Sequence, residues 1–212
     1  MKNIRDILAR SPVMPVIVLN AVADAVPLAE ALVSGGIRVL EVTMRTAAAL
    51  DCVRVIRAAV PGAIVGVGTI TNIADMNAAR EAGAMFGVSP GTTPELLKHA
   101  TASAFPFLPG SMTPSDVMRA LDAGFTAMKL FPAQQAGGIA MLKALGGPFP
   151  QVMFCPTGGI DAESAATYLA LPNVACVGGS WLAPVALIAN KNWNEIQKRA
   201  QAASRFTSDH RT

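Results

Sequence analysis

A single cation, Lys129, lies near the end of the otherwise apolar run from Phe125 to Pro132. Burying an ammonium group without a partner costs free energy, so an amine in such a place is favoured in its neutral form. A neutral amine attacks carbonyl carbons and forms a Schiff base, which makes Lys129 a candidate nucleophile. The alternative is structural, because a lysine in an apolar strand often extends its amine to the surface or pairs with an acid.

Other polar residues follow apolar runs elsewhere in the chain. Alternation after one such run puts Glu41, Thr43 and Arg45 on one face of a strand. Glu41 is a candidate general acid and base, while Arg45 offers a planar fork for a carboxylate and Thr69 a second donor. Two structural alternatives stay open: Glu41 and Arg45 could form a salt bridge at a strand edge, and Thr69 or Thr157 could cap a helix.

Two glycine pairs occur after the last two apolar runs. They are Gly158–Gly159 and Gly178–Gly179, and Ser180 follows the second pair directly. Backbone N–H groups in such loops bind phosphate at the same positions of many barrels, and a serine hydroxyl adds a donor. Tight turns that need positive φ are the alternative explanation. We favour a phosphate site.

Short β-branched runs that alternate with helix-like segments must position these residues. Strands are predicted at 13–19, 39–42, 64–67, 84–88, 104–108, 125–130, 152–155 and 174–177. Helices are predicted at about 3–10, at 23–34, 47–60, 73–82, 94–100, from 113 onward, at 139–145, at 162–169, and in a last pair that ends near 203. The tail, 204–212, is expected to be frayed.

Eight strand–helix units with short links predict a single-domain α/β protein over 1–212, folded as a (β/α)8 TIM barrel. Nearly all-apolar strands suit a parallel sheet covered on both sides. A doubly wound open sheet has the same alternation and remains the alternative fold. Gly66–Val67–Gly68 lacks the third glycine of a dinucleotide-binding fingerprint, so no such cofactor is expected.

Composition excludes several functional classes. The 212 residues carry a net charge of +3, with no basic cluster and 5% aromatic residues, which argues against nucleic-acid binding. No apolar stretch is long enough to span a membrane, and the first six residues lack the apolar core of a signal peptide. The three cysteines, Cys52, Cys155 and Cys176, lack metal-ligand spacing, so we expect no metal and a reducing, cytoplasmic compartment.

Six motifs occur together in an order and spacing that resemble one enzyme family. They are Glu41–Val42–Thr43–Met44–Arg45, Val67–Gly68–Thr69, Ser89–Pro90–Gly91, Lys129–Leu130–Phe131–Pro132–Ala133, Phe154–Cys155–Pro156–Thr157–Gly158–Gly159–Ile160 and Gly178–Gly179–Ser180–Trp181. Over about residues 4–203, the chain resembles the class I 2-keto-3-deoxy-6-phosphogluconate (KDPG) aldolases, which often also act on 4-hydroxy-2-oxoglutarate (KHG).

The resemblance implies a homotrimeric barrel that needs no metal or other cofactor and makes pyruvate and glyceraldehyde 3-phosphate, as in the Entner–Doudoroff pathway. It implies Lys129 as the Schiff-base lysine and Glu41 as the base that transfers protons through a water. The implied contacts of the substrate are Arg45 and Thr69 at the pyruvate carboxylate, Phe131 against the pyruvate moiety, Thr157 near the substrate hydroxyl, and Gly158, Gly159, Gly179 and Ser180 at the phosphate. Gln134 departs from the family, in which many members carry Glu.

Three other functions remain as alternatives. A sibling aldolase would act on the galactonate epimer or mainly on the unphosphorylated hydroxy-oxoglutarate. A phosphate-binding isomerase or epimerase barrel would form no imine and would use Lys129 only electrostatically. A catalytically silent barrel would bind a metabolite without converting it, but the joint presence of Lys129, Glu41 and Arg45 argues against this.

Overall fold

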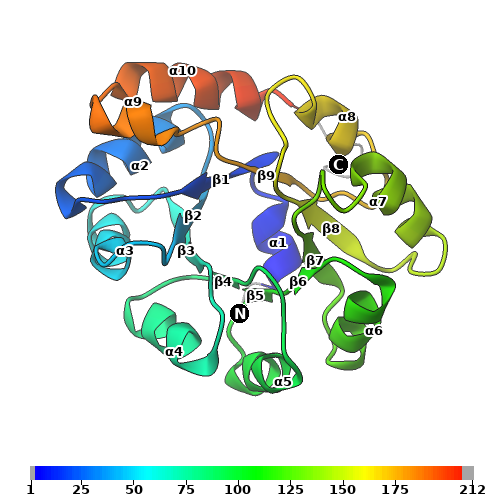
Figure 1. Ribbon diagram of the computed structural model, residues 1–212. Helices are drawn as coiled ribbons and strands as arrows, with labels where there is room; N and C mark the ends of the chain where they lie inside the picture. Colours follow the sequence, from blue (N-terminus) through cyan, green and yellow to red (C-terminus); the bar gives the residue numbers. More distant parts are fainter. Residues whose placement is uncertain (1–2, 207–212) are drawn as a thin grey trace.

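Parallel strands form a closed barrel in the computed structural model, which describes residues 3–206 (Figure 1). The strands are β1 (Val13–Ile17), β2 (Val39–Thr43), β3 (Ile64–Gly68), β4 (Gly87–Val88), β5 (Phe107–Leu108), β6 (Gly110–Ser111), β7 (Ala127–Leu130), β8 (Met153–Pro156) and β9 (Val177–Gly179). They are ordered β5-β4-β3-β2-β1-β9 in one sheet and β6-β7-β8 in the other. Parallel bridges from Phe154 to Val174 and from Thr157 to Gly178 join the two sheets on one side.

A strand interrupted by proline joins the two sheets on the other side. Only Pro109 separates β5 from β6, and its nitrogen has no hydrogen to donate to the ladder. Pairing nevertheless continues, because the Pro109 carbonyl accepts a 2.8 Å hydrogen bond from the Lys129 amide. Counting β5 and β6 as one strand leaves eight strands within residues 3–206. The predicted (β/α)8 barrel is therefore confirmed, and the open doubly wound sheet is excluded.

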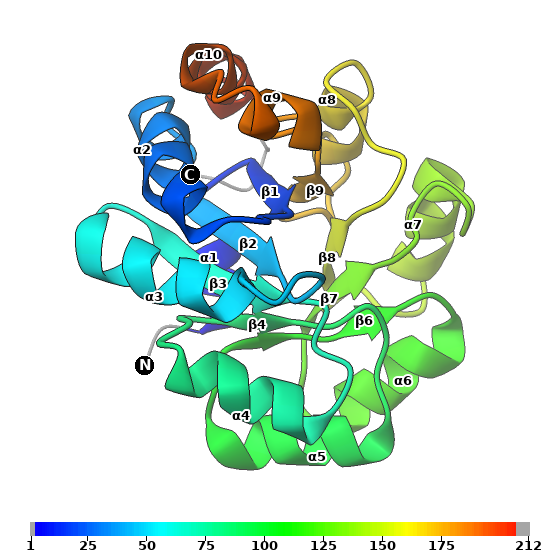
Figure 2. The ribbon, with the colours of Figure 1, turned by 60° about the vertical axis from the view of Figure 1, so that its left-hand side comes forward.

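Helices surround the barrel, and all of them except α9 and α10, which follow β9, connect successive strands. They are η1 (Val22–Asp24), α2 (Ala25–Ser34), α3 (Ala49–Ala59), α4 (Ile73–Glu81), α5 (Pro94–Ser103), α6 (Pro114–Asp122), α7 (Gly138–Gly146), α8 (Ala165–Leu169), α9 (Val185–Ala189) and α10 (Trp193–Ser204). Figure 2 shows α3, α4 and α5 side by side around the outer face. None of the helices in residues 3–206 is both long enough and apolar enough to cross a membrane.

Two apolar cores follow from the alternation of the strands. Leu40 and Val42 of β2 face outward and belong to the large cluster between the barrel and its helices. Val39 of the same strand faces inward and packs in a smaller cluster that fills the barrel. The remaining helix, α1 (Ile4–Leu8), lies within the ring of strands in Figure 1, and its buried side chains belong to this inner cluster. The inner core thus closes one end of the barrel and leaves the other end for a site.

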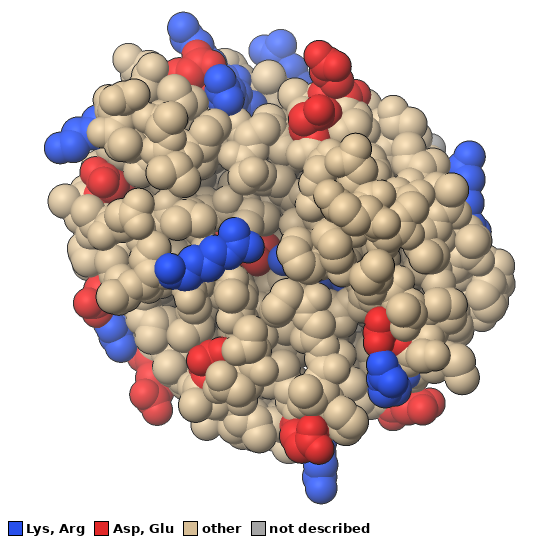
Figure 3. Space-filling model, viewed as in Figure 1, with Lys and Arg blue, Asp and Glu red and all other residues tan. Residues whose placement is uncertain are grey.

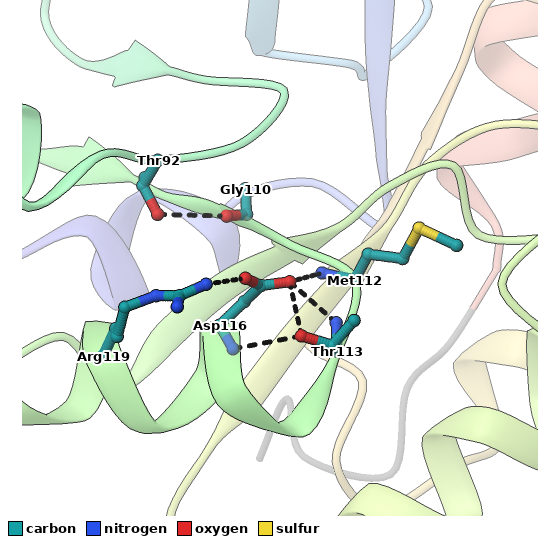
Figure 4. A network of polar contacts seen from close by, with 6 residues as sticks. All are labelled: Thr92, Gly110, Met112, Thr113, Asp116 and Arg119. Atoms are coloured by element: carbon teal, nitrogen blue, oxygen red, sulfur yellow. Dashed lines mark hydrogen bonds and ion pairs between the residues drawn. The ribbon is translucent and has the colours of Figure 1, made fainter.

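The start of α6 illustrates how local sequence fixes an element (Figure 4). Thr113 accepts a hydrogen bond from the Asp116 amide, and the Asp116 carboxylate accepts hydrogen bonds from the Thr113 and Met112 amides. This is a capping box, and Pro114 at the first helical position needs no partner for its nitrogen. Arg119 donates a further hydrogen bond to Asp116 one turn later. The sequence prediction of a helix start here is confirmed.

Several element boundaries differ from the prediction. The strand predicted at 84–88 is reduced to β4, and the strand predicted at 104–108 begins only at Phe107 because α5 continues to Ser103 and ends at Ala104, with φ of 51°. The last strand was predicted at 174–177 and lies at Val177–Gly179. The helix predicted at 3–10 lies at Ile4–Leu8. The frayed tail predicted at 204–212 falls mostly outside the described residues.

Candidate active site

A buried ion pair forms the centre of the candidate site. Lys129 Nζ of β7 lies 3.3 Å from Glu41 Oε1 of β2, and the two residues are 4% and 0% exposed. The other carboxylate oxygen, Glu41 Oε2, is buried and has no hydrogen-bond partner within the described part of the chain. A buried acceptor of this kind ordinarily bonds to a water or a ligand. The pair therefore has a carboxylate oxygen available for a proton-carrying group.

The period of two along each strand explains why these side chains meet. Val39 and Ala127 point into the inner core, so Glu41 and Lys129, two residues further along β2 and β7, point inward as well. Thr157 follows the inward-facing Cys155 by the same two steps. A polar layer thus lies directly above the apolar inner core, at the carboxyl ends of the strands, where TIM barrels have their active sites.

A cavity of about 310 Å³ lies above this layer. Its walls are formed by Val16, Val18, Arg45, Lys129, Phe131, Thr157, Gly158, Gly159, Ile160, Gly178, Gly179 and Ser180. The set includes every residue that the sequence predicted for the site except Glu41, which is fully buried beside the Lys129 amine, and Thr69. Residues from the ends of five strands, β1, β2, β7, β8 and β9, and from the loops that follow them therefore converge on one hollow.

Arg45 belongs to the cavity wall, whereas Thr69 does not. Arg45 is exposed at the cavity wall, and its side chain has no hydrogen bond or ion pair to any other described residue, so the guanidinium is available to a ligand. The alternative of a Glu41–Arg45 salt bridge is wrong, because Glu41 pairs with Lys129. Thr69 follows β3 with φ of 66°, a conformation that is rare for a β-branched residue and often marks a functional position.

The helix-cap alternatives for the two threonines are also wrong. Asn72 caps α4, so Thr69 is not its cap. Thr157 is 5% exposed and donates a 3.4 Å hydrogen bond to the Cys155 carbonyl instead of capping a helix. Its hydroxyl faces the cavity floor beside Lys129 on the neighbouring strand.

Glycines are required around the site for space as well as for backbone conformation. A Cβ at Gly68 would lie 2.1 Å from Glu41 Oε1, and one at Gly178 would lie 2.1 Å from Thr157 Oγ1. Gly158 and Gly159 instead have positive φ, 104° and 76°. The first two glycines make room for reactive side chains, while the second two turn the chain so that its backbone lines the cavity.

Aromatic and aliphatic groups complete the walls. The Lys129 amine lies 5.1 Å from the centroid of the Phe131 ring, within the range of a cation–π contact. Sequence reasoning missed Val16, Val18 and Ile160, which supply apolar surface. Their position at strand ends was the signal for them, but apolar residues at strand ends are equally typical of a core.

Charged side chains are scarce in this part of the molecule. In Figure 3, viewed along the barrel, most Lys, Arg, Asp and Glu side chains lie around the periphery of the face and few lie near its centre. Lys129 and Arg45 are the charged residues of the cavity wall. No group of three or more His, Cys, Asp or Glu within residues 3–206 is arranged to hold a metal ion.

Similarity to a known family identifies the class of protein to which this site belongs. The family described as KDPG and KHG aldolase matches residues 4–199. The chain belongs to this family. Its members carry the aldolase chemistry that the Lys129–Glu41 pair suggests, so an isomerase or silent barrel is no longer favoured.

Individual relatives are similar to this chain over almost its whole length. The sequence is 48% identical over 199 residues to 2-dehydro-3-deoxy-phosphogluconate aldolase of Pseudoalteromonas atlantica, covering 94% of this chain and 93% of the relative. It is 49% identical over 198 residues to KHG/KDPG aldolase of Escherichia coli strain K12, covering 93% of each. The crystal structure of KDPG aldolase from Legionella pneumophila, with pyruvate captured at low pH as a covalent carbinolamine, superposes with a TM-score of 0.94 at 47% identity, covering 96% of this chain and 98% of the other.

Proposed function

We propose that this chain is a class I aldolase that reversibly cleaves KDPG to pyruvate and glyceraldehyde 3-phosphate through a Schiff base on Lys129. The observation that carries the proposal is the buried amine 3.3 Å from a carboxylate at the floor of a 310 Å³ cavity. Family membership and the carbinolamine in the Legionella relative support the same chemistry. We also propose that the chain forms a single catalytic domain.

Imine formation starts with the Lys129 amine. Glu41 can accept a proton from the ammonium across the 3.3 Å contact, which leaves a neutral amine to attack C2 of the keto acid. Glu41 returns that proton to the hydroxyl of the resulting carbinolamine, the hydroxyl leaves as water, and an iminium ion forms beside the restored carboxylate. The ring of Phe131, 5.1 Å from the same nitrogen, favours positive charge there.

Bond cleavage requires a base at the substrate hydroxyl. A proton leaves the C4 hydroxyl toward Glu41 through a water, the C3–C4 bond breaks, and its electron pair passes to the iminium nitrogen. Glyceraldehyde 3-phosphate leaves as the aldehyde, and an enamine of pyruvate remains on Lys129. Glu41 then returns the proton to C3, and hydrolysis of the imine releases pyruvate. The unpartnered Glu41 Oε2 is the acceptor suited to that water.

The two ends of the substrate are anionic and need different partners. Arg45, whose side chain has no partner in the described residues, is suited to the pyruvate carboxylate, and we assign Thr69 as a second donor there. Gly158, Gly159, Gly179 and Ser180 are suited to the phosphate through backbone N–H groups and a hydroxyl. We further propose that Thr157 contacts the substrate hydroxyl and influences which epimer is accepted.

KHG is a second substrate for the same site. The name KHG/KDPG aldolase of the Escherichia coli relative favours this activity, because that relative shares 49% of its aligned residues with this chain. KHG carries the same 2-keto and 4-hydroxyl groups, so Lys129 and Glu41 would act on it unchanged.

The homotrimer implied by the resemblance is also part of the proposal. A closed cyclic assembly is the common form for oligomers built from one chain. Light scattering coupled to size-exclusion chromatography should give three times the mass of the 21.9 kDa chain. A monomeric mass at working concentration would contradict it.

The function is tested by cleavage of KDPG, followed by enzymatic reduction of the pyruvate formed. The wild-type chain should release pyruvate and glyceraldehyde 3-phosphate in equal amounts. Lys129→Ala should lose all measurable turnover, since no other described lysine lines the cavity. Turnover that survives in Lys129→Ala would contradict the Schiff-base mechanism.

A further inference from the structure

Two glycines leave the inward face of β3 open beside Glu41. They are Gly66 and Gly68, which alternate with outward-facing residues along the strand. A Cβ at Gly66 would lie 2.5 Å from Phe86 Cε1, and one at Gly68 would lie 2.1 Å from Glu41 Oε1. Side chains from outside β3 therefore fill the space that this strand leaves open inside the barrel.

Phe86 and Glu41 enter this space from opposite sides of β3. Glu41 is on β2, which pairs with β3 on one side, and Phe86 directly precedes β4, which pairs with β3 on the other. The Phe86 carbonyl accepts a 3.0 Å hydrogen bond from the Val67 amide, which fixes the Phe86 backbone to β3. Both side chains are fully buried, and the Phe86 ring belongs to the inner apolar cluster.

The register of the strands shows how the ring affects the carboxylate. Glu41 is the partner of Gly66 in the β2–β3 ladder, so the open space directly across from Glu41 is the one over Gly66. Atoms Cδ1, Cε1 and Cζ of Phe86 lie 2.5–2.6 Å from the position of a Cβ there, so the ring occupies that space. The Glu41 side chain extends over Gly68 instead, and its Oε1 atom lies 3.3 Å from the Lys129 amine.

We propose that Phe86 is a positioning residue for this reaction: its ring fills the space over Gly66 and thereby holds the Glu41 carboxylate over Gly68, facing Lys129. The inference rests on the proposed function, because it takes Glu41 to be the group that transfers protons. A side chain with several rotatable bonds keeps one position in a close-packed interior when neighbouring atoms occupy the alternatives. Without the ring, Glu41 could turn toward Gly66 and away from the amine.

The test replaces Phe86 with leucine and follows exchange of the pyruvate methyl protons in heavy water at several pyruvate concentrations. Leucine lacks the Cε1 and Cζ atoms that cover Gly66. We expect kcat for exchange to fall about ten- to hundredfold, because a displacement of about 1 Å in a catalytic group costs roughly 100-fold in rate. KM for pyruvate should stay nearly unchanged, because Arg45 and Lys129, which we assign to pyruvate binding, keep their places.

Phe107→Leu is the matched control. Phe107 is also buried, at 1% exposed, but its ring packs in the outer cluster and against Phe125. Both variants lose the same atoms from a packed core, so both should lower the midpoint of urea denaturation. Only Phe86→Leu should slow exchange. Equal slowing in the two variants, or wild-type exchange in Phe86→Leu, would overturn the inference.

Phe86→Met gives a graded comparison, because an unbranched side chain can extend further over Gly66 than leucine does. It should retain more of the exchange rate than Phe86→Leu. A loss as large as that in Phe86→Leu would also overturn the inference, since the space over Gly66 would then not be what matters.

Borohydride trapping with pyruvate and a parallel measurement on Glu41→Gln separate this inference from the proposed function. Absence of an adduct in the wild-type chain, or undiminished exchange in Glu41→Gln, would contradict the proposed mechanism itself. Intact adducts and slow exchange in Glu41→Gln, together with wild-type exchange in Phe86→Leu, would overturn only the role of Phe86.

Discussion

Gly68→Ala tests whether the position of the Glu41 carboxylate controls the reaction. The added methyl group would lie 2.1 Å from Glu41 Oε1 and 2.7 Å from both Cδ and Cγ. Because three atoms of one side chain are too close, rotation of the carboxylate alone does not relieve the contact. Glu41 is fully buried, so the side chain has to shift as a whole by about 0.9 Å to restore a separation of 3.0 Å.

A displacement of about 1 Å in a catalytic group costs roughly 100-fold in rate. We expect kcat/KM for KDPG cleavage to fall by about this factor in Gly68→Ala. Overpacking should lower the free energy of unfolding by about 1–3 kcal/mol. The Lys129 amine belongs to a different strand, and water can take its proton in place of a displaced Glu41, so the imine with pyruvate should still form.

The assay is exchange of the pyruvate methyl protons in heavy water, followed by NMR, with borohydride trapping in parallel. Gly91→Ala is the control, because no atom lies within 4 Å of a Cβ at that exposed glycine. It should keep both activities. Wild-type methyl exchange in Gly68→Ala would refute the reasoning, since a displaced Glu41 would then transfer protons as well as a correctly placed one.

Three further outcomes are expected. Glu41→Gln should still form the imine, more slowly and with water as the proton acceptor, but should slow methyl exchange about 10²- to 10⁴-fold, and rapid exchange would remove Glu41 from the role of base. Ser180→Ala should raise the KM for KDPG about three- to tenfold more than that for KHG, and equal effects would argue against a phosphate contact. Burial tends to raise the pKa of the Asp116 carboxyl, but hydrogen bonds from Thr113, Met112 and Arg119 lower it overall. The ionised carboxylate therefore stabilises the fold at pH values above the pKa that Asp116 has in the unfolded chain. This stabilisation is lost as the pH falls through the lower pKa of the folded chain. Asp116→Asn should therefore lose about 1 kcal/mol of unfolding free energy at pH 7, measured by urea denaturation, and a deficit that persisted at pH 2 would contradict this explanation.

The candidate site residues lie at strand ends, which sequence patterns indicate, so much of their grouping could be predicted. Alternation in two strands was enough to direct Glu41 and Lys129 inward, and the closed barrel brings β2 and β7 to opposite parts of one small ring. The contact itself, 3.3 Å between residues 88 positions apart, required the closed ring and could not be read from either strand alone.

Other features depended on packing between distant segments. The contact of Gln134 with Gly159 arises where two loops run side by side, and no local pattern in either loop indicates it. α5 extends past residue 100 and ends at Ala104, which has a left-handed conformation that alanine rarely adopts. The break at Pro109, in contrast, could have been predicted from the missing amide hydrogen.

Borohydride reduction in the presence of pyruvate, followed by tryptic mapping, tests the central claim most directly. An imine on Lys129 would be reduced to a stable carboxyethyl-lysine, which trypsin does not cleave. Residues 120–143 should then appear as one uncut peptide that carries the added mass, because Lys129 is the only cleavage site between Arg119 and Lys143. Normal cleavage after Lys129, or an adduct on any other lysine, would contradict the assignment of Lys129 as the Schiff-base residue.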